Sequence, residues 1–335
     1  MKVAKFTNFI PQNIAFYNTE KIGVYNSKGK RLGGFGLQNL RLPRLGNKLY
    51  SVGVLSDIHI TYDTATEDFQ KALTYLNDNI DVAFTCISGD LTENGTEDEL
   101  TQFKSLVEEY SKNTHVELIP GNHERFNLYR EIYERVIGKP LYYSFEYGND
   151  VYIMIGCYSW ASDGVFTVES LQWLYETLER YKDKRCFIFT HVFPWGDSGN
   201  PKELYYFDIF SGTKGSVFLS LLKHYKNVIL FHGHSHTKFY LQEVDKKANY
   251  SEALGYRSVH IPSLAVPRDI ESNTLTNIYS DSEGYVMDVY KNHVVLRGRD
   301  FVKEKFLPIA TYCLDTTLVE IEANTFVDST GTITT

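Results

Sequence analysis

The stretch Tyr50-Ser51-Val52-Gly53-Val54-Leu55-Ser56-Asp57-Ile58-His59 decides the fold. Its first six residues form a short and mainly apolar run, which is typical of a strand buried in a sheet. Asp57 and His59 follow this run directly, so polar side chains stand at the carboxyl end of the strand. Because ligands of open α/β sheets bind at that edge, the stretch predicts both a buried strand and a site.

The same arrangement of an apolar run followed by polar residues recurs four times downstream. Each run has the length of a strand. The runs cover 82–88, 116–119, 186–190 and 228–231, and they lead into Gly89-Asp90, Gly121-Asn122-His123-Glu124, His191 and His232-Gly233-His234-Ser235-His236. We therefore expect five polar segments at one edge of the fold.

Helices are expected between the first strands. Thr64 with Glu67, and Thr96 with Glu99, have the spacing of a capping box, in which two side chains satisfy backbone N–H groups at a helix start. Apolar residues then recur on one helical face after each pair. Strands that alternate with helices predict an α/β fold.

Antiparallel strands are expected after residue 140 and near the N-terminus. The runs 142–147 and 151–157 flank the turn cluster Gly148-Asn149-Asp150, which predicts a hairpin. A second, largely antiparallel sheet is predicted by strands at 256–261, 285–290 and 293–299. Residues 1–48 contain a turn sequence at 26–30 that predicts another hairpin.

Composition narrows the class of protein. The chain has 335 residues, of which 43% are hydrophobic and 23% charged, as in ordinary globular proteins. The net charge of −8 and the lack of long basic runs argue against stable nucleic-acid binding. The four cysteines are widely spaced, and three lie in strand-like runs typical of reduced, buried thiols. No signal peptide or membrane span is predicted, so a cytoplasmic location is the default expectation.

Each polar segment alone is a weak signal, but their combination is specific. The order and spacing of Asp57-Ile58-His59, Gly89-Asp90, Gly121-Asn122-His123-Glu124, Thr190-His191 and Gly233-His234-Ser235-His236 closely resemble the calcineurin-like metallophosphoesterase family. The resemblance covers about residues 49–300. It implies a four-layer α/β/β/α sandwich, in which two packed mixed β-sheets are flanked by helices and a dinuclear metal site lies at the carboxyl ends of the strands.

The resemblance also implies a ligand set. One metal would bind Asp57, His59 and His236, the other would bind Asn122, His191 and His234, and Asp90 would bridge both. A mixed nitrogen and oxygen set suits two divalent transition-metal ions, manganese, iron or zinc, without selecting one.

The activity implied is metal-dependent hydrolysis of phosphate esters, with a phosphodiesterase as the leading prediction. A hydroxide between the metals would attack phosphorus, and His123 would protonate the leaving group. The substrate would be a small-molecule or polymer phosphate ester. Glu124 stands where many relatives have Asp, and Glu93 follows the Gly-Asp motif without the tyrosine ligand of purple acid phosphatases, so a purple iron site is not expected.

Three alternatives stay open at this point. The enzyme could be a phosphomonoesterase, or the fold could be a catalytically silent scaffold. It could also be a phosphodiesterase of a phage or cell-surface assembly that acts on a wall polymer. We expect an N-terminal extension at 1–48 that docks to a partner, a catalytic domain at 49–300, and a tail at 301–335 that packs on or extends that domain.

Overall fold

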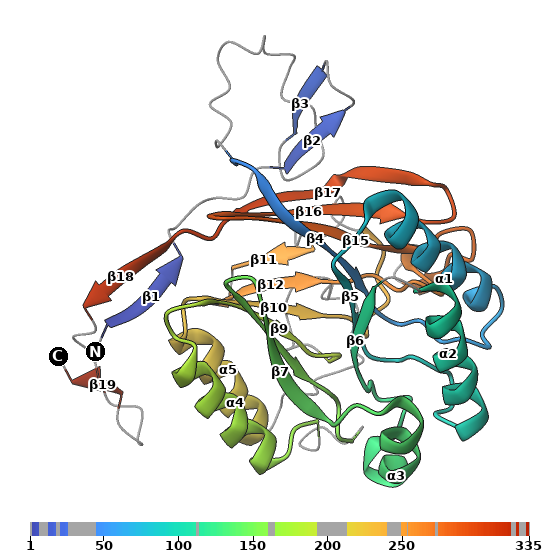
Figure 1. Cartoon of the computed structure of the whole chain (residues 1–335), viewed down its shortest axis with the longest axis horizontal. Coiled ribbons are helices and arrows are strands. Elements are labelled where there is room, and N and C mark those ends of the chain that lie inside the picture. The colour runs from blue at the N-terminus through green and yellow to red at the C-terminus, as the bar shows by residue number, and fades with distance from the viewer. Residues whose placement is uncertain are drawn as a thin grey trace.

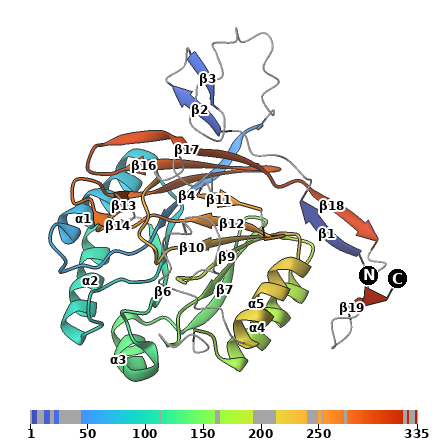
Figure 2. The same cartoon turned by 180° about the vertical axis from the view of Figure 1, so that it is seen from behind.

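Two large mixed sheets pack face to face, with helices on both outer faces (Figures 1 and 2). This arrangement confirms the expected four-layer sandwich. The computed structural model describes residues 2–6, 13–17, 21–25, 45–111, 114–159, 165–192, 213–239, 249–252, 254–271, 274–322, 326–327 and 333–334.

The first sheet has eight strands. Its parallel part is β4, β5 and β6, and the remaining strands join antiparallel beyond β4. In spatial order the strands are β3 (Lys21–Tyr25), β2 (Asn13–Tyr17), β17 (Lys305–Asp315), β16 (His293–Asp300), β15 (Glu283–Tyr290), β4 (Lys48–Leu55), β5 (Phe84–Ser88) and β6 (His115–Ile119).

The second sheet has six strands. Its central four are parallel, and β11 and β7 close the two edges antiparallel. In spatial order the strands are β11 (Tyr250–Ser251), β12 (Arg257–His260), β10 (Val228–His232), β9 (Arg185–Phe189), β8 (Asp150–Ile155) and β7 (Tyr142–Tyr147). The pairing of β7 with β8 confirms the predicted hairpin.

The expectation that the last strands form a sheet of their own is wrong. β12 joins β10 in the six-stranded sheet, whereas β15 and β16 extend the eight-stranded sheet beside β4. The reason is burial: seven of the eight residues of β15 are buried, so this strand requires a neighbour at each edge and cover on each face.

The helices form the outer layers. The eight-stranded sheet is covered by α1 (Ala65–Thr74), the π-helix η1 (Tyr75–Ile80), α2 (Glu97–Tyr110) and α3 (Phe126–Ile137). The six-stranded sheet is covered by α4 (Val168–Arg180) and α5 (Thr213–His224). Between the sheets lies the central core, to which Val54, Tyr152 and Phe231 contribute, all fully buried.

The two predicted capping boxes have different outcomes. At α2, Glu99 N–H donates to Thr96 Oγ1 (3.3 Å) and Thr96 N–H donates to Glu99 Oε2 (3.2 Å), which confirms the box. At α1 the prediction is wrong, because the Thr64 hydroxyl donates to Asp68 Oδ2 (2.9 Å) and caps no backbone group. Its ψ of 4° is far from the extended value of an N-cap, so its oxygen is not aimed at the helix start.

The two ends of the chain pair with each other. β1 (Lys2–Phe6) pairs antiparallel with β18 (Leu318–Glu322), and β2 meets β17 at the pair Asn13 and Tyr312. Two further pairs join β13 (Arg268–Glu271) with β14 (Thr274–Asn277) and β19 (Phe326–Val327) with β20 (Ile333–Thr334). The predicted turn at 26–30 lies outside the described residues, directly after the β2 and β3 pair.

Two sequence expectations concern thiols and membranes. All four cysteines are buried free thiols, as expected. Within the parts of the chain that the structure describes, every helix is too short or too polar to cross a bilayer.

Candidate metal centre

All seven predicted metal ligands lie at the carboxyl ends of strands that face one another. They follow β4, β5 and β6 of one sheet and β9 and β10 of the other, and none is more than 6% exposed. The residues are Asp57, His59, Asp90, Asn122, His191, His234 and His236. The structure thus brings together every residue of the predicted set, while their role as ligands stays a prediction.

The backbone at these strand ends is unusual. Asp57, His59, Asp90, His234 and His236 all have positive φ, between 42° and 72°. Non-glycine residues rarely adopt this left-handed conformation, because the Cβ crowds the following carbonyl oxygen. The sharp turns aim five side chains into one small volume.

Close packing explains two glycines of the motifs. A Cβ on Gly121 would lie 2.1 Å from Asp90 Oδ1, and one on Gly233 would lie 1.9 Å from Ser56 Oγ. Both distances are far below any real contact. The loops can approach each other only because these positions lack a side chain.

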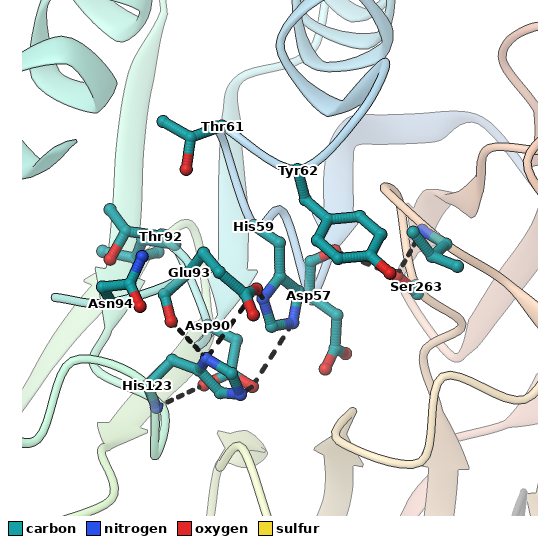
Figure 3. A network of polar contacts seen from close by, with 12 residues as sticks. Asp57, His59, Thr61, Tyr62, Asp90, Thr92, Glu93, Asn94, His123 and Ser263 are labelled. Carbon is teal, nitrogen blue, oxygen red and sulfur yellow. Dashed lines mark hydrogen bonds and ion pairs between the residues drawn. The ribbon is translucent and has the colours of Figure 1, made fainter. Parts of the chain in front are cut away.

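Asp57, His59, Asp90 and His236 form the first group of donor atoms. His236 Nε2 lies 3.0 Å from Asp57 Oδ1 and 3.2 Å from His59 Nε2. His59 Nε2 also lies 3.5 Å from Asp90 Oδ2. Figure 3 shows Asp57, His59 and Asp90 converging at the strand ends.

The second group shares Asp90 with the first. Asp90 Oδ2 lies 3.0 Å from His191 Nε2, which is also 3.0 Å from Asn122 Oδ1 and 3.2 Å from His234 Nδ1. One carboxylate oxygen therefore stands between two sets of nitrogen and oxygen atoms. This geometry fits a carboxylate that bridges two cations.

Two histidines are held in the tautomer that a metal requires. His59 Nδ1–H donates to Glu93 Oε2 (2.8 Å), and His191 Nδ1–H donates to the carbonyl oxygen of Ser88 (2.8 Å). In each ring the lone pair of Nε2 is then left facing the other donor atoms. Such supporting hydrogen bonds are typical of metal-binding imidazoles, so the residues present fit a pair of divalent ions.

The ionisation states agree with that fit. Burial lowers the pKa of His234 to about 3 and that of His236 to about 4, so both rings are neutral. Burial would raise the pKa of Asp90, but the charge of His191 holds it well below its usual range. Burial would likewise lower the pKa of His191, but the Asp90 carboxylate raises it to about 9. In the absence of a metal a proton on His191 supplies the positive charge that ionised Asp90 requires.

Comparison with known proteins supports the same interpretation. The profile of the calcineurin-like phosphoesterases matches residues 50–238. This chain belongs to that family. No curated protein sequence matches it.

Solved structures show that this metallophosphoesterase shares its fold with distant proteins. Purple acid phosphatase PPD1 from yellow lupin (Lupinus luteus) seeds has a TM-score of 0.58 and 15% identity, over 88% of this chain and 59% of that one. GAP50, the anchor in the inner membrane complex of Plasmodium, has a TM-score of 0.55 and 14% identity, over 80% of this chain and 89% of that one. The chain thus spans 59% of the lupin protein, and at these identities the likeness concerns the fold alone.

His123 lies beside the predicted ligands of this metallophosphoesterase but is oriented differently. Its Nδ1–H donates to the carbonyl oxygen of Glu93 (2.6 Å), and its Nε2 lies 4.0 Å from Asp90 Oδ2. Its side chain is 29% exposed, so the ring can meet a substrate. Figure 3 shows it below Glu93 and next to Asp90.

Glu93, Glu124 and His260 support the site in ways that the sequence indicates only partly. Glu93 accepts the hydrogen bond that orients His59, and in the sequence only its position three residues after Asp90 points to this role. Glu124 accepts hydrogen bonds from the backbone of Leu91, Thr92 and Gly121, which ties two motif loops together.

Two further histidines are fully buried near the Gly-His-Ser-His segment. His260 Nε2 lies 2.8 Å from Ser235 Oγ and so supports the segment, a contact that the sequence does not predict. His232 belongs to β10, and its ring lies 5.7 Å from that of His260. Neither residue lines the metal cavity.

Two cavities meet at Asn122 and His123. The first, of about 230 Å³, is lined by five of the seven predicted ligands together with Arg268, Asn277 and Tyr62. The second, of about 510 Å³, is lined by Asn122, His123, Arg125, Asn127, Leu128 and Ser159. Arg268, which no sequence motif marks, donates from Nε to Asn277 Oδ1 (3.3 Å) and forms no ion pair with any described residue.

Proposed function

We propose that this metallophosphoesterase hydrolyses phosphodiesters with the help of two divalent transition-metal ions, manganese, iron or zinc. One observation carries the proposal: Asp90 Oδ2 stands between two separate groups of metal-binding atoms. When bound, two such ions polarise phosphoryl oxygens and lower the pKa of water to near neutrality.

His123 is suited to protonate the leaving oxygen. Because its Nδ1–H is donated to Glu93 O, its Nε2 is the atom that faces the cavity. A protonated Nε2 can donate to the ester oxygen as the bond to phosphorus breaks. This is the task of a general acid.

Arg268 is suited to bind a phosphoryl oxygen. Its side chain lines the metal cavity, and its guanidinium has no carboxylate partner among the described residues. A guanidinium offers a fork of N–H donors that matches the geometry of two phosphate oxygens.

The shape of the site supports a diester over a monoester. The phosphorus of a diester carries two organic groups, and two cavities adjoin at Asn122 and His123, one lined by predicted ligands and one lined by Arg125, Asn127 and Leu128. A monoester would leave one of them without an occupant. The exposed Leu128 and the polar Asn127 allow the second cavity to accept a leaving group of mixed character.

The test is a substrate panel with protein loaded separately with manganese, iron or zinc. We expect kcat/KM for bis-p-nitrophenyl phosphate to exceed that for p-nitrophenyl phosphate by at least about tenfold, a difference of about 1.4 kcal/mol in activation free energy. The Asp90→Asn variant is the control for contaminating enzymes. Preference for the monoester would refute the diester assignment, and no hydrolysis with any metal would identify a silent scaffold.

A further inference from the structure

Arg299, on β16, is a buried arginine that has no carboxylate partner among the described residues. It is 5% exposed, and its guanidinium carbon lies 3.4 Å from the centre of the Tyr75 ring, with Phe306 at 5.1 Å and Phe301 at 6.0 Å. No described residue forms a hydrogen bond or ion pair with this guanidinium, and its Nε is fully buried without an acceptor.

Stacking alone leaves the charge of this group incompletely compensated. The ring faces attract the cation, but they accept none of its N–H groups in the plane of the guanidinium. Burying a charge that is not paired and hydrogen-bonded is unfavourable. We therefore expect the Arg299 guanidinium to have an additional partner that accepts hydrogen bonds from its N–H groups.

The neighbouring Arg297, on the same strand, is a stacked arginine that also pairs with a carboxylate. Its guanidinium carbon lies 4.5 Å from the centre of the Phe306 ring, so it is also stacked. In addition, its Nη2 donates to Asp288 Oδ1 (3.2 Å), and its Nε lies 2.7 Å from Asp288 Oδ2 as part of the same ion pair. Arg299 has the stacking contacts but lacks the carboxylate.

An open cleft of about 480 Å³ begins at Arg299. Arg299 and Phe301 are its buried part, and the π-helix η1 supplies one wall; π-helical turns are frequent at functional sites. The other residues around it come from α1, η1 and the turn after β16 and are polar or aromatic: Glu67, Gln70, Lys71, Thr74, Tyr75, Asn79 and Glu304.

We propose that this cleft binds a small polar molecule through a phosphate or carboxylate group that pairs with Arg299. Two oxygens of that group match the fork of N–H donors of the guanidinium, and Lys71 adds a second cation at the rim. The exposed carboxylates of Glu67 and Glu304 face the same cleft, so the rest of the ligand carries hydroxyl or ammonium groups. The site is separate from the proposed catalysis, because no residue of this cleft lines the metal cavity.

The experiment counts anion sites on the metal-loaded protein by calorimetric titration with inorganic phosphate and, separately, with succinate. Phosphate should bind twice to the wild type, once at the metals and once in the cleft. Arg299→Gln should weaken the second binding by ~10- to 100-fold, the range for one lost hydrogen-bonded ion pair, while turnover stays at the wild-type level. Arg297→Gln is the matched control, because it removes a stacked arginine outside the cleft, and it should keep both sites.

Each outcome decides the proposal. If phosphate binds only at the metals and succinate binds nowhere, or if Arg299→Gln and wild type bind equally, the cleft is no anion site. Tight binding of succinate without phosphate would assign the site to carboxylates, and the reverse would assign it to phosphates. Should Arg299→Gln fail to fold, Lys71→Met at the exposed rim replaces it, and unchanged anion affinity in that variant would overturn the proposal.

Discussion

Two groups of buried acidic side chains in this protein are neutralised in different ways. Asp57 and Asp90, at the strand ends, are surrounded by histidines. Asp281, Glu283 and Asp300, beside the start of β15 and the end of β16, are accompanied by lysines. Both groups have the spacing of a metal site, so spacing alone does not distinguish them.

The second group is satisfied by the protein itself. Lys238 Nζ donates to Asp281 Oδ2 (3.2 Å), and Lys303 contacts both Asp281 and Asp300. Glu283 accepts from Phe239 N–H (2.7 Å), and burial raises its pKa to about 8, so it is largely neutral at pH 7. Two permanent cations and one protonated acid leave no net demand for a metal. The first group has only titratable histidines, which can lose their protons to solvent when a metal binds.

An Asp→Asn substitution can be made in both groups of acids, and the largest effect is expected at Asp90, in the group surrounded by histidines. Asp90→Asn keeps the shape but removes the charge that joins the two sets of donor atoms. Metal content should fall, and turnover should drop by at least about 10³-fold, as expected when several kcal/mol of charge stabilisation are lost. Elemental analysis and kcat measure both effects. If this variant binds two metals and keeps full turnover, the two groups of acids do not differ in metal binding.

A second, comparably large effect is expected at His123, which touches the site without being a predicted ligand. His123→Asn should retain both metals and lose ~10²- to 10⁴-fold in turnover on alkyl esters, the range of general acid catalysis. The loss should shrink for p-nitrophenyl esters, because that leaving group needs little help from a proton. A leaving-group series at matched metal content provides the measurement, and an equal loss on every ester would contradict the acid role.

The corresponding substitution in the group accompanied by lysines, Asp281→Asn, should change stability only. Asp281→Asn leaves Lys238 and Lys303 with weaker partners, so the free energy of unfolding should fall by about 1–3 kcal/mol. Metal content and turnover of the folded variant should match the wild type. Urea denaturation and the metal assay of the first prediction test both statements, and loss of metal would show that the two groups are functionally linked.

The smallest effect is expected at Glu283, and it depends on pH. The folded state raises the pKa of this acid from 4.5 to about 8. The folded protein therefore binds the proton more tightly than the unfolded chain, so this contribution to stability is complete below pH 4.5 and declines as pH rises toward 8.

Glu283→Gln keeps an acceptor for Phe239 N–H and removes the ionisation. At pH 5 it should differ from the wild type by less than about 1.5 kcal/mol, the usual limit for substitutions of equal volume. Its stability relative to the wild type should then increase from pH 5 to pH 8. Denaturation curves across this range provide the check, and parallel pH profiles would mean that Glu283 is ionised in the fold.

The sequence predicts those parts of the molecule that are encoded locally. An apolar run that ends in Asp57 or His191 indicates both a strand and a candidate ligand within a few residues, so the sequence predicts where the strands end and which side chains meet there. Strand partners are not encoded locally, which is why β15 and β16 were assigned to the wrong sheet. Arg268 reaches the metal cavity through the β13 and β14 pair, and Arg299 meets Tyr75 across more than two hundred residues, so no motif could indicate either one.

The positive φ angles at Asp57, His59, Asp90, His234 and His236 have a consequence for ion selectivity. A left-handed turn sets the direction in which a side chain leaves the backbone, so a large displacement of its donor atom requires the loop to move. The spacing of two bound ions would then depend on the backbone of the strand ends. Among ions that prefer the same ligands, choice then depends on radius and coordination geometry. Loop residues that touch no metal, such as Ile58, are therefore positions at which metal preference can be changed.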